Sequence, residues 1–204
     1  MPTGADLNTR EPGCLEFSFT GTERVIAARV TTTTGERIRL HFLSAPAGPD
    51  LTPETLRGLL PEDVATRSLG DVPQPADEAA TTAGLNVSAL FGELTAENCF
   101  PATPEEDLSA YCTMVVSSHG FPAGVLVRGD QFLLPGRSGL PLGVVGQSAF
   151  LIQNIDIEPG DDFYLHSDLT HVGELRRLHK GLTEHAVPAD FTEAGLCVIR
   201  MSFT

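Results

Sequence analysis

Three stretches in the C-terminal half of the sequence decide the predicted fold. Residues 118–128 read SHGFPAGVLVR, residues 139–144 read GLPLGV and residues 157–168 read IEPGDDFYLHSD. In the first and third stretches, a turn rich in glycine and proline leads into a run of β-branched and other apolar residues, which is typical of a strand. Gly129-Asp130 follows the first stretch and predicts a tight hairpin turn. This part of the chain is therefore expected to consist of short strands joined by turns.

The N-terminal part of the sequence predicts more strands. Residues 15–19 and 37–42 alternate between apolar and polar side chains, and residues 24–33 are rich in β-branched residues. These patterns predict a meander of three strands. Residues 1–13 contain two prolines and two glycines without periodicity, so we expect a flexible leader before a single β-rich domain over residues 14–204.

Prolines recur between Ala45 and Pro75 and interrupt long strands or helices, so loops and short helices are expected there. Thr52 is placed to cap a short helix, with Pro53 at its first position. Residues 76–94 predict a second helix, because leucines recur there at roughly helical spacing. The predicted fold class is β-rich α+β, a two-layer β-sandwich with a few short helices.

The composition is that of a globular protein and limits the classes of partner. Hydrophobic residues make up 41% of the 204 residues and charged residues 20%. The formal net charge of -14 disfavours nucleic acid and anionic membrane surfaces as partners, because the average surface repels phosphate groups. A phosphorylated protein remains compatible as a partner, and homo-oligomerisation is left open.

The cysteines and the short apolar runs indicate in which cellular compartment the protein is expected. Cys14, Cys99, Cys112 and Cys197 are far apart and show no zinc-ligand spacing, so we interpret them as buried free thiols. The N-terminal residues lack the basic and apolar regions of a signal peptide, and the longest apolar runs are too short to cross a bilayer. These observations predict a cytoplasmic protein.

The order and spacing of the three stretches quoted above resemble the C-terminal half of a known family. This is the SpoIIE-type family of bacterial metal-dependent serine/threonine protein phosphatases, which act in sporulation and sigma-factor control. In that family a turn resembling Gly-His-Pro, a Gly-x-Pro-Leu-Gly loop and a Pro-Gly-Asp turn follow one another, and the last turn feeds a strand that ends in an aspartate. The resemblance implies a phosphatase-like regulatory protein, either active or a degenerate non-catalytic relative.

The resemblance also implies a metal site made of three aspartates. Asp168 matches the aspartate that ends the family's strand, Asp190 precedes the last predicted strand, and Asp71 lies in the only Gly-Asp-Val sequence of the chain. The family holds Mn²⁺ or Mg²⁺ with such carboxylates, which are ligands that these hard cations prefer. The metal ions would activate a water molecule for attack on phosphoserine or phosphothreonine, so no further catalytic side chain is assigned. The chain departs from the family at Leu169, where the family has a glycine.

Two other functions remain open from the sequence. One is a non-enzymatic β-sandwich that binds a partner or assembles with itself. The other is an iron-dependent dioxygenase of the jelly-roll type, because His166 and Asp168 form a His-x-Asp triplet that ligates iron in such enzymes. A third ligand would then come from the histidines that follow, which are His171, His179 and His185.

Overall fold

The computed structural model describes residues 15–20, 24–33, 37–95, 112–121, 124–134, 137–144, 150–158, 160–166, 177–178, 180–181 and 198–203. Its strands are β1 (Leu15–Thr20), β2 (Arg24–Thr33), β3 (Arg37–Pro46), β4 (Ser88–Thr95), β5 (Cys112–His119), β6 (Val125–Arg128), β7 (Gln131–Leu133), β8 (Gln153–Ile157), β9 (Asp162–His166) and β10 (Val198–Phe203). Its helical elements are α1 (Pro53–Arg57), the 3-10 turn η1 (Leu69–Asp71) and α2 (Pro73–Ala83).

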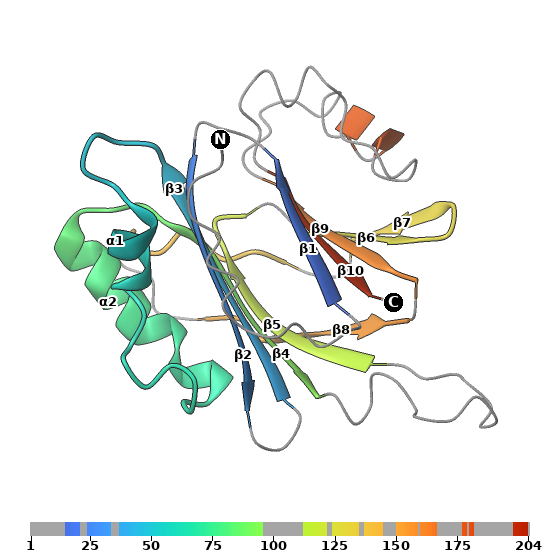
Figure 1. Ribbon diagram of the computed structural model, residues 1–204, viewed down its shortest axis with the longest axis horizontal. Coiled ribbons are helices and arrows are strands. Elements are labelled where there is room, and N and C mark those ends of the chain that lie inside the picture. The colour runs from blue at the N-terminus through green and yellow to red at the C-terminus, as the bar shows by residue number, and fades with distance from the viewer. Residues whose placement is uncertain are drawn as a thin grey trace.

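The strands form two antiparallel sheets that face each other (Figure 1). Sheet A has the order β1-β10-β9-β6-β7, and sheet B has the order β2-β3-β4-β5-β8. Helices α1 and α2 lie on the side of sheet B that faces away from sheet A (Figure 1). The described part of the chain therefore has a sandwich with a helical layer on one outer face, which confirms the predicted fold class.

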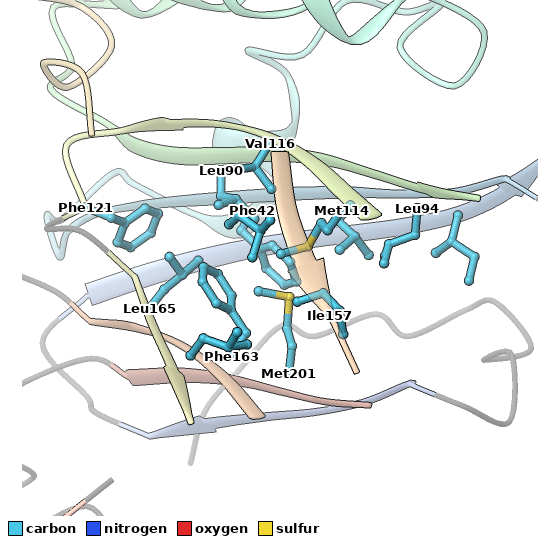
Figure 2. Packing of buried hydrophobic residues seen from close by; sticks show 14 of the residues in the cluster. Phe42, Leu90, Leu94, Met114, Val116, Phe121, Ile157, Phe163, Leu165 and Met201 are labelled. Atoms are coloured by element: carbon cyan, nitrogen blue, oxygen red, sulfur yellow. The ribbon is translucent and has the colours of Figure 1, made fainter. Parts of the chain in front are cut away.

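Alternation along the strands of sheet B separates two apolar cores. Side chains such as Phe42 and Leu90 point to sheet A and pack against Phe163 and Met201 (Figure 2). Because successive side chains of a strand point to opposite faces, the intervening residues face the helices. The second core therefore lies between sheet B and the helical layer. It contains Leu43, Phe91, Leu56, Ala76 and Ala80.

The first helix begins where the sequence predicts it. Thr52 adopts an extended conformation, and its hydroxyl accepts a hydrogen bond from the backbone N–H of Thr55, while Pro53 occupies the first turn. The second helix differs from the prediction. It spans Pro73–Ala83 and ends at Gly84, and residues 88–95 form β4 instead. Both faces of β4 are buried, so its sequence does not alternate between apolar and polar residues. The spacing of its leucines therefore resembled that of a helix.

The predicted meander of three strands is wrong at its first strand. β1 pairs with β10 in sheet A, where Leu15 lies opposite Phe203, whereas β2 and β3 pair with each other in sheet B. Alternation predicts that a segment is a strand but does not say which sheet it joins. The hairpin turn at Gly129-Asp130 is confirmed between β6 and β7.

The leader of residues 1–13 lies outside the described residues, and a single domain over residues 14–204 stays a prediction. Among the residues that the structure does describe, no helix is long and apolar enough to span a membrane.

Candidate functional site

The loop of residues 139–143, which we call the clasp loop, is tied to the end of sheet B. The backbone N–H of Gly139 donates to the carbonyl oxygen of Ser118 at 2.8 Å, and the N–H of Gly120 donates to the carbonyl oxygen of Gly139 at 2.9 Å. Leu142 exchanges two backbone hydrogen bonds with Val87, just before β4. The clasp loop therefore joins the end of β5 to the start of β4.

Two glycines make this close approach feasible. A Cβ atom on Gly120 would lie 2.9 Å from the ring of Pro141, and one on Gly143 would lie 1.9 Å from the carbonyl oxygen of Leu85. Gly143 also has a φ of 84°, a left-handed conformation that favours glycine. Its backbone N–H donates to the Asp77 carboxylate of α2 at 2.8 Å. The Gly-x-Pro-Leu-Gly motif thus has a structural role in joining the clasp loop to the helical layer.

The Pro-Gly-Asp turn before β9 is held by hydrogen bonds to the Asp161 side chain. The Asp161 carboxylate accepts two hydrogen bonds from the Arg128 guanidinium at 2.9 and 2.7 Å, and one from the backbone N–H of Glu158 at 2.8 Å. Such a forked pair fixes orientation as well as position. β9 is therefore anchored to β6, beside it in sheet A.

A glycine allows a similarly close approach inside the sandwich. A Cβ atom on Gly124 would lie 2.3 Å from the Cζ atom of Phe163, so the aromatic ring occupies the place of a side chain at position 124. Gly124 directly precedes β6, and Phe163 belongs to the neighbouring β9. The missing side chain therefore lets the Phe163 ring lie over the backbone at Gly124.

His119 lies on the helical side of sheet B and is fully buried. Its Nε2 atom lies 2.8 Å from the Ser117 hydroxyl, and its ring packs edge-on against Phe150 at 5.3 Å between centroids. Burial lowers the pKa of His119 to about 4, although the nearby Asp77 carboxylate and a hydrogen bond to the backbone of Leu140 oppose the shift. Ser117 is also fully buried, so this serine and histidine hydrogen-bond to each other inside the layer under the helices.

His41 is the second buried histidine of this layer. Burial lowers its pKa to about 4, and the positive charges of Arg29 and Arg39 add to the effect. Its ring lies 6.2 Å from Phe91, which in turn lies 6.0 Å from His119. Its Nδ1 atom has no hydrogen-bond partner in the described part of the chain. Both histidines are therefore neutral members of the apolar layer under the helices.

The structure places Asp71 in the helical layer. It is the last residue of η1, it is exposed, and its neighbours Leu69 and Val72 pack into the core between sheet B and the helices. It lines an open surface hollow of about 460 Å³, together with Asp63, Arg67, Ser68, Gly70, Gln74, Pro75 and Glu78. Sheet B therefore lies between Asp71 and β9 of sheet A.

Asp168 and Asp190, the other two predicted metal ligands, lie outside the described residues, as do His171, His179 and His185. β9 ends at His166, which is two residues before Asp168. Within the ranges that the structure describes, His, Cys, Asp and Glu residues form no group of three or more that could hold a metal ion. The three-aspartate metal site stays a prediction.

His166, the first residue of the His-x-Asp triplet, is fully buried at the end of β9. Phe163 and Leu165 of the same strand belong to the core between the sheets. His166 alternates with Leu165, so its side chain lies on the opposite face of sheet A. Nothing in this arrangement supports an iron-dependent dioxygenase.

A row of polar side chains lies at one end of the inner face of sheet B. Ser44, Ser88 and Ser118, which we call the hydroxyl row, come from β3, β4 and β5 and are buried. Ser44 and Ser88 lie directly opposite each other, and Ser118 lies opposite Leu90. The row therefore crosses three neighbouring strands at the same end of the sandwich.

Arg24, at the start of β2, extends the hydroxyl row by one strand. Its Nε donates to the Ser44 hydroxyl at 2.8 Å, and one terminal nitrogen donates to the Ser44 carbonyl oxygen at 3.1 Å and to the Ser88 hydroxyl at 3.4 Å. Arg24 is half-buried. The guanidinium is therefore held against the row rather than extended into solvent.

Ser118 differs from the other two serines of the row. Its side chain is only 8% exposed, and its hydroxyl has no hydrogen-bond partner in the part of the chain that the structure describes. It borders a small void with Leu165 of β9 and Gln153 of β8. The end of β9 therefore lies at the same end of the sandwich as the hydroxyl row, and Figure 2 shows Leu165 near that end of the core.

Sequence reasoning missed Arg24 and the hydroxyl row because isolated serines and arginines in strands match no motif. A signal was nevertheless present in the alternation. Ser44, Ser88 and Ser118 occupy inward positions next to Phe42, Leu90 and Val116, where a buried sheet face calls for apolar side chains. Three such departures at one end of the same face mark a polar site.

The described groups at this end do not suit Mg²⁺ or Mn²⁺. Both cations prefer carboxylate oxygens, whereas Arg24, Ser44 and Ser88 offer a guanidinium and neutral hydroxyls. The positive charge of Arg24 also repels a divalent cation. Arginine and hydroxyl donors instead suit an anion.

The sequence matches no protein family model and no curated protein. The crystal structure of the RsbU and RsbW domains of a Mycobacterium tuberculosis protein is similar at a TM-score of 0.68 and 11% identity, over 93% of this chain and 61% of that chain.

Two further solved structures are similar. RsbX in complex with magnesium has a TM-score of 0.59 and 12% identity, over 96% of this chain and 98% of that chain. The PP2C phosphatase domain of SpoIIE from Bacillus subtilis, with a fragment of its regulatory domain, has a TM-score of 0.57 and 12% identity, over 93% of this chain and 63% of that chain. This chain thus spans less than two thirds of the first and third structures, and its fold is that of serine/threonine phosphatase domains of the PP2C, SpoIIE and RsbU type.

Proposed function

We propose that this chain is a phosphatase-like regulatory protein that recognises phosphoserine or phosphothreonine side chains of a partner protein. The observation that carries the proposal is the two-sheet fold, which it shares over most of its length with regulatory serine/threonine phosphatases. The Pro-Gly-Asp turn supports it, because Arg128 and Asp161 hold β9 in a fixed position before Asp168.

The described residues favour recognition over hydrolysis. Asp71 lies in the helical layer and is exposed, and the inner end of the sandwich presents Arg24 and hydroxyl groups instead of carboxylates. RsbX was solved with magnesium. In this chain Asp71, Asp168 and Asp190 remain the proposed ligands of Mg²⁺ or Mn²⁺.

The test compares matched peptides that differ only in phosphorylation. Fluorescence anisotropy with degenerate phosphoserine and phosphothreonine peptides, each beside its unphosphorylated form, should show tighter binding of the phosphorylated peptides. Equal binding of the two forms contradicts the proposal.

Hydrolysis is measured in the same preparation. With Mn²⁺ or Mg²⁺ and a chromogenic phosphate ester, we expect the rate to equal that of the Asp168→Ala variant. Metal-dependent hydrolysis that is lost in Asp168→Ala would instead establish an active phosphatase and support the predicted aspartate site.

A further inference from the structure

We propose that Arg24, together with the hydroxyl row, binds the phosphoryl group of a phosphorylated side chain without a metal ion. The choice of a phosphorylated protein side chain as the ligand rests on the proposed function. The anion site itself rests on the contacts of Arg24, Ser44, Ser88 and Ser118.

The site is formed by neighbouring strands of one rigid sheet. β2 and β3 pair over the full length of β2, and β3 pairs with β4 from Arg37 to Ser44. Arg24 and Ser44 are both anchored at the end of this ladder, where Ser44 is completely buried. A site on paired strands keeps its geometry better than one on a loop, so its donors are held in place before a ligand arrives.

The hydrogen bonds of Arg24 orient the serine hydroxyls as donors. Each serine hydroxyl has one hydrogen to donate and two lone pairs that accept. At Ser44 and Ser88 the guanidinium N–H groups use an accepting lone pair, so the hydroxyl hydrogen is left for an acceptor. The hydrogen bonds of Arg24 run from its Nε and one terminal nitrogen to Ser44 and Ser88. Together these groups form a cluster of N–H and O–H donors, which matches the oxygens of a phosphoryl group.

The Ser118 hydroxyl is an independent sign of a ligand. It belongs to the next strand, is more than nine-tenths buried, and has no partner among the residues described. A buried hydroxyl without a hydrogen bond is destabilising, so a ligand oxygen that reaches it recovers this cost. Ser118 lies on β5 opposite Leu90, two residues along from Ser88, and borders the small void lined by Leu165.

Charge distinguishes a phosphoryl group from other oxygen ligands. The chain carries a net charge of -14, so its average surface repels anions. The half-buried guanidinium of Arg24 supplies a local positive charge where partial burial strengthens its attraction. A phosphorylated side chain brings a charge of about -2 and several acceptor oxygens, which is the best complement to one guanidinium with three hydroxyls.

The test measures binding of inorganic phosphate and of a phosphoserine peptide by calorimetry, with EDTA present throughout. Arg24→Gln should weaken binding of both probes about tenfold, and Ser88→Ala should weaken it about threefold, because a charge-assisted hydrogen bond contributes more than a neutral one. The matched control is Arg29→Gln. Arg29 lies on the same strand and is exposed, and its neighbour Ala28 faces the core between the sheets, so Arg29 faces away from the site. We expect no change there.

A second variant shows whether weaker binding by Arg24→Gln comes from loss of the binding group or from misfolding. Arg24→Lys keeps the charge but loses the planar fork, so it should bind more weakly than the wild type and more tightly than Arg24→Gln. Nuclear magnetic resonance of the Arg24 side chain gives a direct readout, since its Nε–H signal should shift when phosphate is added to the wild type. An unshifted signal at saturating phosphate contradicts the site.

The outcomes separate this site from the proposed function. If the phosphoserine peptide binds but Arg24→Gln and Ser88→Ala leave its affinity unchanged, the anion site is wrong and the proposed function stands. If phosphate binding depends on Arg24 while phosphorylated and unphosphorylated peptides bind equally, the site stands and the proposed function is wrong. Binding that is absent in EDTA but present in a parallel titration without EDTA shows a metal-mediated site and overturns the inference.

Discussion

The two faces of one end of sheet B differ in how their polar groups are satisfied. On the helical face, Ser117 is bonded to His119 and the Asp77 carboxylate is bonded to Gly143. On the inner face, the Ser118 hydroxyl has no partner among the described residues. Alternate residues of β5 take part in both arrangements. Polar groups that satisfy one another hold a fold together, whereas donors left over at a buried site are available to a ligand.

The comparison also separates the family-like motifs from the candidate chemistry. The motif residues Gly120, Gly139 and Gly143 join the clasp loop to the sheet and to α2. The groups suited to bind an anion, Arg24 and the hydroxyl row, match no motif. Resemblance at the motif residues therefore identifies the scaffold and does not establish the reaction.

The largest effect expected is acid destabilisation of the helical face. The pKa values of His41 and His119 are lowered from 6.5 to about 4, because burial disfavours the charged imidazolium. Between pH 6.5 and 4 the unfolded chain therefore binds more protons than the folded chain. The contribution of the neutral histidines to the free energy of unfolding is fully present above about pH 6.5 and is lost as the pH falls towards 4. The loss should be about 3 kcal/mol for each histidine.

Urea unfolding at pH 7, 5.5 and 4 measures this dependence. The matched variants His41→Gln and His119→Gln should each flatten the slope between pH 6.5 and 4. A slope that is identical in the wild type and both variants would show that other groups cause the acid sensitivity.

The second effect tests the clasp loop. Gly143→Ala should lower the free energy of unfolding by about 3 kcal/mol or more, because the new Cβ would lie 1.9 Å from the Leu85 carbonyl oxygen at a φ of 84°. Gly129→Ala is the control, since Gly129 also has a positive φ but has open space around it. Its cost should be about 1 kcal/mol. Similar losses in the two variants would mean that the clasp loop adapts freely.

A smaller effect is expected at the link from the helical layer to the clasp loop. Asp77→Ala removes the acceptor for the Gly143 N–H and should cost about 1 to 2 kcal/mol. Asp77→Asn keeps an acceptor oxygen, so it should cost less than half as much. Thermal unfolding monitored by circular dichroism ranks the three proteins, and an equal loss in both variants would assign the effect to charge rather than to this hydrogen bond.

The smallest expected effect is a gain in stability, from a substitution on the inner face of sheet B. Ser118→Ala removes a buried hydroxyl without a partner and should raise the free energy of unfolding by about 0.5 to 1 kcal/mol. Ser117→Ala, one residue away on the helical face, loses the bond to His119 and should lower it by about 1 kcal/mol. Denaturant midpoints of the two variants decide the matter. A loss of stability in Ser118→Ala would show that this hydroxyl already contributes to the fold.

Much of the fold could be predicted from the sequence, because local signals determine it. Thr52 and Pro53 encode the start of α1, Gly129 encodes the β6–β7 hairpin, and alternation encodes most strands. Pairing over long distances could not be predicted. β1 joins β10 from the far end of the chain, and no local pattern records that choice.

The candidate site was less predictable than the fold. Asp71 was selected by its Gly-Asp-Val context, yet the structure places it on an exposed 3-10 turn, because the prolines at 73 and 75 start α2 directly after it. Arg24, Ser44 and Ser88 come together only through the pairing of β2 with β3 and of β3 with β4. A site assembled from single residues of separate strands has no sequence spacing to recognise.

The ring of Phe163 against Gly124 has a consequence for tracing distant relatives of this chain. A Cβ atom at position 124 would displace the Phe163 ring, and one at position 143 would clash with the Leu85 carbonyl oxygen, so a chain that packs in the same way favours glycine at both places. Aligning candidate genes on these two backbone positions first would reveal which relatives have an arginine at the position of Arg24.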